Sequence, residues 1–133
     1  MTKGSTTRKL SKAVAQDCMK FLTRYEPVIV VLTEPGAGSE YPLQSDRVIL
    51  GRGPDVHLAF DDDHLSRQHA VFELSADGFQ VRDLGSTNGI KVNDQKVDVV
   101  ALKHGDRISL GRLTFQYVVQ ERPDHIEFEV SDD

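Results

Sequence analysis

The chain has 133 residues, a mass of 14.8 kDa and a formal net charge of −5. This length suits one domain with a short extension and is sufficient to bury a stable core. The excess of acids argues against nucleic acid as the main partner. No apolar run approaches the roughly 20 residues that span a bilayer, and charged residues interrupt every stretch that resembles a signal peptide. Cys18 is the single cysteine, so it has no internal disulfide partner and we expect a cytoplasmic protein.

The charge is unevenly distributed along the chain. Residues 1–25 carry six Lys or Arg and one Asp, whereas residues 120–133 carry six acids and one Arg. The two ends therefore have charges of +5 and −5, and the middle retains −5. A basic head and an acidic tail would attract one another, although exposed charges of this kind contribute little individually.

The first element that the pattern predicts is an amphipathic helix from about residue 7 to residue 25, after a polar segment expected to be disordered. Apolar side chains recur there at three- and four-residue spacing, and most basic side chains lie elsewhere on the helix. The apolar positions are Leu10, Val14, Cys18, Phe21, Leu22 and Tyr25. Pro27 prevents the helix from continuing, and Glu26 before it favours an extended conformation.

Three roles fit this helix. Its apolar stripe would pack on the rest of the domain, or it would dock on another protein or a second copy of the chain. In the third role, its basic face would lie on an anionic membrane. Because Cys18 lies on the apolar stripe, we interpret it as a small buried hydrophobic residue rather than a redox switch.

From residue 28 onward the hydrophobic period changes from helical to strand-like. A β-branched run at residues 28–32 ends in a turn cluster rich in Gly and Pro. The clearest alternation is at residues 112–119, where every second side chain is apolar. Further strands are expected at residues 41–44, 48–50, 56–60, 70–74 and 79–82. Many short strands without intervening helices predict an antiparallel β-sandwich.

Three short polar clusters separate these strands. They are Gly51-Arg52, Ser66-Arg67-Gln68-His69 and Ser86-Thr87-Asn88-Gly89. Their guanidinium groups, hydroxyls and amide form a donor-rich set on loop tips, which suits an anion with several acceptor oxygens. Apart from His69, no member is an obvious general base beside a nucleophile. We therefore expect a phosphate-binding site rather than a catalytic centre.

The acidic run Asp61-Asp62-Asp63-His64 superficially resembles a metal site. Consecutive residues point in different directions, however, and no second ligand group stands at metal-site spacing. We interpret the run as a solvated acidic loop and expect neither a metal nor a cofactor. The sequence also lacks a P-loop, a kinase Gly-rich loop, a Gly-x-Ser-x-Gly elbow and a zinc signature, which argues against an enzyme.

The order and spacing of the clusters are more specific than any one of them. They run Val48–Arg52, Leu65–Ala70, Asp83–Gly89, Val92-Asn93 and Leu102–Asp106, and Gly111 with Phe115 continues the pattern. This arrangement resembles the forkhead-associated (FHA) domain over residues 28–119. Two positions depart from the family pattern, because Ile90 stands where Thr is frequent and Asp94 stands where Gly is frequent.

The resemblance implies an all-β fold, an FHA-type eleven-stranded antiparallel β-sandwich. We expect it at residues 27–120, preceded at 1–26 by the polar segment and the amphipathic helical extension, and followed at 121–133 by the acidic tail. The loops at one end would bind a phosphothreonine peptide. Phosphate and peptide contacts are expected from Arg52, Ser66, Arg67, Thr87 and Asn88. Structural support of these loops is expected from Gly51, His69 and Gly89.

The implied function is a non-enzymatic phosphothreonine-binding signalling adaptor downstream of a Ser/Thr kinase. The alternative is an FHA scaffold or regulatory subunit that binds a partner independently of phosphorylation, through the N-terminal helix or a sheet face. Acids at residues 61–63 would favour ligands with basic residues near the phosphothreonine. Thr6 and Thr7 precede a basic stretch and are candidates for phosphorylation. A phosphorylated N-terminal segment that folded back into the site would block other partners.

Overall fold

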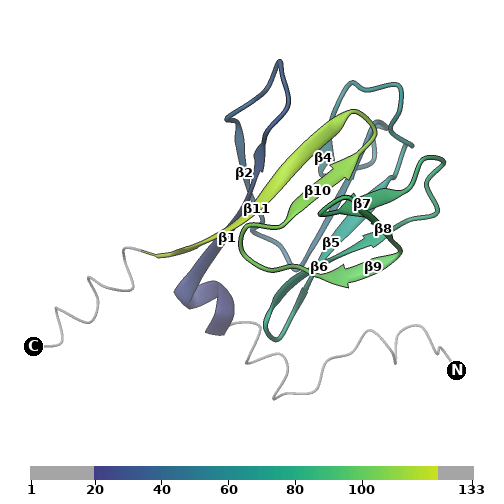
Figure 1. Cartoon of the computed structure of the whole chain (residues 1–133). Coiled ribbons are helices and arrows are strands. Elements are labelled where there is room, and N and C mark those ends of the chain that lie inside the picture. Colours follow the sequence, from purple (N-terminus) through teal and green to yellow (C-terminus); the bar gives the residue numbers. More distant parts are fainter. Residues whose placement is uncertain (1–19, 123–133) are drawn as a thin grey trace, which may run out of the picture.

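The structure is a computed structural model and describes residues 20–122 (Figure 1). Two β-sheets pack face to face, and residues 20–24 form a helical turn ahead of the first strand. The strands are β1 (Tyr25–Val31), β2 (Glu40–Pro42), β3 (Arg47–Gly51), β4 (Leu58–Ala59), β5 (Ala70–Ser75), β6 (Gly78–Asp83), β7 (Ile90–Val92), β8 (Gln95–Val97), β9 (Val99–Ala101), β10 (Arg107–Leu110) and β11 (Leu113–Glu121). The prediction of an eleven-stranded β-sandwich is confirmed.

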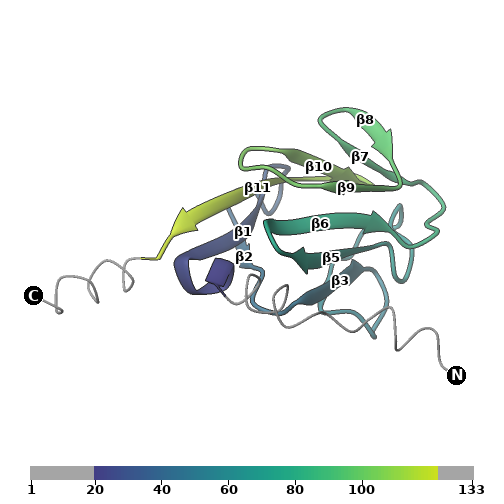
Figure 2. The ribbon, with the colours of Figure 1, turned by 90° about the horizontal axis from the view of Figure 1, so that it is seen from below.

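The two sheets have six and five strands. Their orders are β2-β1-β11-β10-β7-β8 and β4-β3-β5-β6-β9, and Figure 2 shows them as two layers. Within the described chain one pairing departs from the antiparallel pattern, because β4 runs parallel to β3. The side chain of His57 extends this short pairing, since its Nδ1 accepts a hydrogen bond from the Ile49 amide at 2.8 Å.

Alternating side chains from both layers fill the space between the sheets. The longest pairing joins β1 and β11, which places Ile29 opposite Tyr117. Both residues are almost completely buried and share one core cluster with Phe72 and Phe79 of the other sheet. Burying a side chain of this size stabilises the fold by about 1.5–3 kcal/mol. Burial raises the pKa of Tyr117, while the hydrogen bond that its hydroxyl accepts from the Phe79 amide opposes that shift.

The last turn of the predicted helix packs against the sandwich. The side chain of Leu22 contacts the core cluster, and its carbonyl accepts a 2.6 Å hydrogen bond from Nε of Arg122. Strand β1 begins at Tyr25, so the helix ends one residue earlier than predicted. The remainder of the predicted helix, Thr6 and Thr7, and all but two residues of the acidic tail lie outside the described residues.

The β7–β8 hairpin turns on Asn93 and Asp94, which both have positive φ angles, 53° and 72°. A two-residue turn of this type favours Asn-Gly, because a side chain in the left-handed region costs about 1 kcal/mol. We therefore expect Asp94→Gly to raise the free energy of unfolding by about 0.5–1 kcal/mol in urea denaturation. Asp94→Ala, which keeps the Cβ atom, should give no gain, and equal stability of both variants would contradict this explanation.

Candidate functional site

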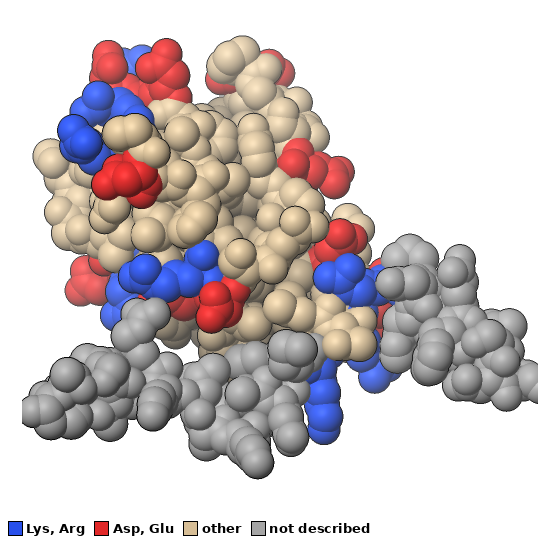
Figure 3. Space-filling model, turned by 180° about the vertical axis from the view of Figure 1, so that it is seen from behind, with Lys and Arg blue, Asp and Glu red and all other residues tan. Residues whose placement is uncertain are grey.

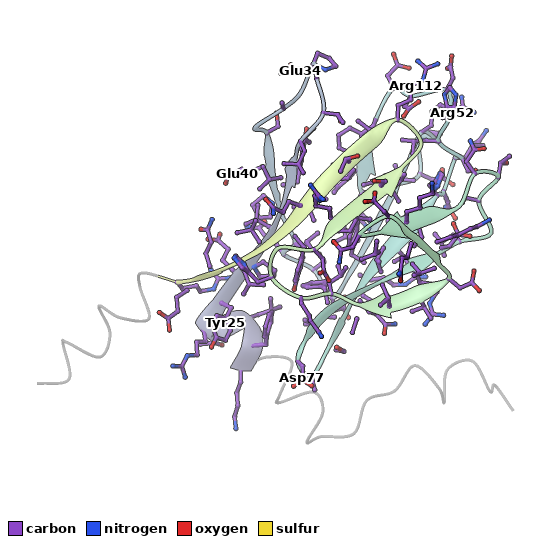
Figure 4. All side chains as sticks on the ribbon, in the orientation of Figure 1. Tyr25, Glu34, Glu40, Arg52, Asp77 and Arg112 are labelled. Carbon is purple, nitrogen blue, oxygen red and sulfur yellow. The ribbon has the colours of Figure 1, made fainter. Side chains whose placement is uncertain are left out.

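The predicted site residues lie on three loops at one end of the sandwich. These loops are residues 52–57 after β3, 60–69 between β4 and β5, and 84–89 between β6 and β7. Figure 4 shows Arg52 at this end, whereas Tyr25 and Asp77 lie at the opposite end. Ser66 is half-buried, and the exposed members of the set are Arg52, Arg67, Thr87 and Asn88.

Hydrogen bonds between the loops bring these residues together. The Ser66 hydroxyl accepts from the Thr87 amide at 3.1 Å, and the Asn88 side-chain amide donates to the His64 carbonyl at 2.9 Å. The Arg52 amide donates to the Ser66 carbonyl at 3.0 Å. Arg67 belongs to the same hydrogen-bond network through its backbone, because its carbonyl accepts from the Gly53 amide at 3.1 Å. The sequence clusters therefore form one surface.

Several donors of this surface have no partner within the part of the chain that the structure describes. The guanidinium of Arg52 donates through Nε to the Leu65 carbonyl at 3.1 Å, which leaves its terminal nitrogens for a ligand. The Ser66 hydroxyl accepts a hydrogen bond and still has its own proton to donate. Within residues 20–122, the Arg67 guanidinium and the Thr87 hydroxyl have no hydrogen-bond or ion-pair partner. This inventory matches the acceptor oxygens of a phosphate.

His69 links two of the three loops from inside the domain. It is fully buried, its Nδ1 accepts from the Ser66 amide at 3.0 Å, and its Nε2 lies 2.8 Å from the Gly89 carbonyl. Because Nδ1 is an acceptor, Nε2 carries the proton and donates it to that carbonyl. Both ring nitrogens are thus occupied, and the imidazole has no free nitrogen for acid–base chemistry.

Two glycines allow the backbones of the loops to pass close to each other and to turn tightly. A Cβ atom at Gly51 would lie 2.1 Å from the backbone oxygen of Arg67, well inside van der Waals contact. Gly89 has a φ of 77°, a left-handed conformation that side chains disfavour. The positions of both glycines are consistent with the supporting role that the sequence predicts for them.

Ser86 was a possible phosphate donor on sequence grounds, but its hydroxyl is committed to the loop itself. It donates to the Asp83 carboxylate and accepts from the Gly89 amide at 2.9 Å. The other Asp83 oxygen accepts from the amides of Gly85 and Ser86, each at 3.2 Å. Asp83 therefore shapes the 84–89 loop, a role that its position three residues before a Ser in a turn makes detectable in the sequence.

Asp62 corrects the prediction of a solvated acidic loop. Its side chain is only 7% exposed, and its two oxygens accept from the amides of His64 at 2.9 Å and Arg112 at 2.8 Å. Burial alone would raise its pKa, but these hydrogen bonds and the charges of His64 and Arg112 outweigh burial and lower it. Asp61 and Asp63 are exposed, as predicted. In the described part of the chain, no His, Cys, Asp or Glu cluster is able to hold a metal ion.

Charges of both signs are mixed at the loop end. Figure 3 views the molecule from behind, and blue and red side chains gather there at the upper left, with mainly uncharged surface below them. Figure 4 shows both Arg52 and Arg112 at this end. On the face that Figure 3 shows, the loop end is therefore not the continuous basic surface that a nucleic acid backbone would need. No helix within residues 20–122 is long and apolar enough to cross a membrane.

The comparisons with known proteins agree with this architecture. A family model of the FHA domain matches residues 48–111. A domain solved in a structural and functional study of phosphothreonine-dependent FHA domain interactions is 31% identical in sequence, with a TM-score of 0.63. The match covers 74% of this chain and 98% of that domain. The chain belongs to the FHA domain family.

Two further relatives of this FHA chain are named as regulators. The glycogen accumulation regulator GarA of Mycolicibacterium smegmatis is 37% identical, over 73% of this chain and 61% of that protein. The oxoglutarate dehydrogenase inhibitor of Corynebacterium jeikeium is 35% identical, over 68% of this chain and 63% of that protein. The FHA chain thus spans about 60% of the length of these two relatives.

The position of Asp62 makes the stability of the FHA domain dependent on pH. Its pKa is lowered by folding, so the carboxylate stabilises the domain above its ordinary pKa of 3.8, and this contribution is lost as the pH falls through the lower folded-state value. We expect Asp62→Asn to reduce the free energy of unfolding at pH 7 by about 1–3 kcal/mol. The difference from the wild type should shrink between pH 5 and pH 3 in denaturant titrations.

The neighbouring exposed carboxylate supplies the control for this measurement. Asp63→Asn removes the same charge from the same loop without removing a buried acceptor, so its stability should follow the wild type at both pH values. If Asp63→Asn and Asp62→Asn behaved alike, the hydrogen bonds of Asp62 would not be the cause of the effect.

Proposed function

We propose that this FHA domain is a non-enzymatic adaptor that binds phosphothreonine-containing proteins downstream of a Ser/Thr kinase. The observation that carries the proposal is the group of unused donors of Arg52, Ser66 and Thr87, which interloop hydrogen bonds hold on one surface. A phosphothreonine offers a charge of about −1.5 to −2 and three acceptor oxygens. Its charge and hydrogen-bonding capacity complement the donors of this surface.

The remaining two predicted residues extend the site beyond the phosphate. Arg67 is exposed on the same loop as Ser66, which supports a role in adding a second positive charge beside the phosphate. Asn88 donates its side-chain nitrogen to the His64 carbonyl, which leaves its side-chain oxygen to accept from the main chain of a bound peptide. In this proposal the phosphate contacts supply most of the affinity, and Asn88 orients the peptide.

The expected affinity is moderate. Charge-assisted hydrogen bonds contribute roughly 1.5–3 kcal/mol each, so three give about 5–9 kcal/mol before ordering costs. Because Ser66 and Arg52 are already held by the loops, little side-chain freedom is lost on binding. A few peptide contacts then bring the dissociation constant to about micromolar, which suits reversible signalling.

The relatives support a regulatory role. One is named for the regulation of glycogen accumulation, and the other for the inhibition of oxoglutarate dehydrogenase. The structurally similar domain was studied for phosphothreonine-dependent interactions. None of these descriptions is that of an enzyme, and the occupied imidazole of His69 is consistent with a protein that binds rather than reacts.

The direct test is titration of a phosphothreonine peptide library onto the full chain, with matched phosphoserine and unphosphorylated libraries. We expect micromolar binding that is confined to phosphothreonine and at least ten-fold weaker in Arg52→Ala, because that variant loses a charge-assisted contact. Arg24→Ala removes an exposed arginine from the opposite end and should bind like the wild type.

Equal binding of phosphorylated and unphosphorylated peptides would overturn the proposal. So would unchanged affinity in Arg52→Ala. Absence of binding to any peptide would favour the phosphorylation-independent alternative, in which the N-terminal helix or a sheet face recruits the partner. Truncation before Pro27 would then be the next variant to compare, because it removes the helix while retaining most of the sandwich.

A further inference from the structure

Two lysines face each other across the β7–β8 hairpin. Lys91 and Lys96 are direct cross-strand partners, and the two-residue turn makes Val92 and Gln95 the closing hydrogen-bonded pair. The lysines are then the next pair, of the non-hydrogen-bonded kind that brings side chains closest. Like charges directly opposite each other destabilise a sheet. Within residues 20–122 neither lysine has an ion-pair or side-chain hydrogen-bond partner.

The pair lies on the outer face of the six-stranded sheet. Ile90 and Val92 are buried on either side of Lys91, so alternation places the lysine side chains on the opposite face. Arg107 of β10 alternates with buried Ile108 and is on this face too. Strand β8 is the edge of the sheet, as Figure 2 shows, so no other strand of residues 20–122 covers the pair from that side.

Three carboxylates stand near this face in the sequence, those of Asp94, Asp98 and Asp106, and within residues 20–122 none of them forms an ion pair. Asp106 accepts from the Asn93 side chain at 3.0 Å and from the Lys103 amide at 2.8 Å, so both of its oxygens are engaged. Asp94 stands in the turn and forms no ion pair with a described residue. Lys91, Lys96 and Arg107 are exposed on this face and have no ion-pair partner within residues 20–122; we call them the hairpin cations.

The hairpin cations adjoin the proposed phosphopeptide site. A Cβ atom at Gly89 would lie 2.9 Å from Cε and 3.6 Å from Nζ of Lys96, so the ammonium group is beside that glycine. Gly89 directly follows Asn88, and its carbonyl is held by the buried His69. A peptide that contacts Thr87 and Asn88 needs to extend only a short distance past this loop to reach the lysines.

We infer that the hairpin cations bind an acidic segment of the same phosphoprotein whose phosphothreonine occupies the loop site. This inference rests on the proposed function. The ligand chemistry is an anionic side chain a few residues from the phosphothreonine, either a carboxylate or a second phosphate. Lysine ammonium groups suit both, because they act as point charges without a fixed fork geometry. A bound anion would also relieve the repulsion between Lys91 and Lys96.

The test uses phosphothreonine peptides of equal length with neutral, Glu-rich or Lys-rich flanks, titrated onto the full chain at low and high salt. Separate peptides carry the acidic residues before or after the phosphothreonine. The Glu-flanked peptide is expected to bind about five-fold tighter than the neutral one at low salt, and salt should reduce that advantage. A peptide with phosphoserine in place of the Glu residues tests whether a second phosphate is preferred.

The Lys91→Glu variant distinguishes an effect on peptide binding from an effect on folding stability. It converts the repulsive pair into an attractive one, so the midpoint of thermal unfolding should rise by a few degrees. The same variant should lose the five-fold advantage of the Glu-flanked peptide and retain its affinity for the neutral peptide. The double variant Lys91→Glu/Lys96→Glu should prefer the Lys-flanked peptide.

The possible failures are distinguishable. If the neutral phosphothreonine peptide binds but acidic flanks give no advantage, the inference is overturned and the proposed function stands. An advantage that persists unchanged in Lys91→Glu would place the acidic segment elsewhere and also overturn it. If no phosphothreonine peptide binds, the proposed function fails, and the inference that rests on it fails too.

Discussion

The buried imidazole of His69 holds the functional end of this domain in place. Both of its nitrogens are hydrogen-bonded to backbone groups of different loops, the Ser66 amide and the Gly89 carbonyl. In a low-dielectric interior such bonds are strong, and an unpaired buried group would be costly. Neither loop is therefore free to move independently of the other. Ser66 makes one of these contacts and Asn88 directly precedes the other, so this interaction fixes the positions of both site residues.

The acceptors and the donors near the site have different roles. The carboxylates of Asp62 and Asp83 accept from backbone amides of the loops, and the Leu65 carbonyl accepts from Arg52. These acceptor oxygens are thus occupied by hydrogen bonds within the protein, whereas hydroxyl and guanidinium donors remain available at the surface. A loop end whose acceptors are already hydrogen-bonded and whose donors remain available is preorganised to bind an anionic ligand.

The sequence contains enough information for the sandwich and for the loops that carry the candidate site, because apolar alternation is visible locally and the order of the loop motifs resembles the FHA pattern. The motifs around Arg52, Ser66 and Asn88 stand at loop positions between apolar runs, and β11 alternates cleanly over nine residues. The role of Asp62 was missed because its burial depends on Arg112, 50 residues away in the chain. The resemblance implied eleven strands, but the bounds of β7 to β10 were not predicted. One or two residues separate β7, β8 and β9, so the hydrophobic pattern shows no boundary between them.

The contact between Arg122 and the helical turn has a consequence for how this domain combines with others. The Arg122 amide donates to the Arg24 carbonyl at 3.0 Å, so the two ends of the described region are adjacent. Both lie at the end of the sandwich that carries Tyr25, opposite Arg52 (Figure 4). Adjacent ends favour insertion of a folded unit into a surface loop of a host protein. In such a chimaera the host chain would enter and leave at one point, and the phosphopeptide loops would project away from it.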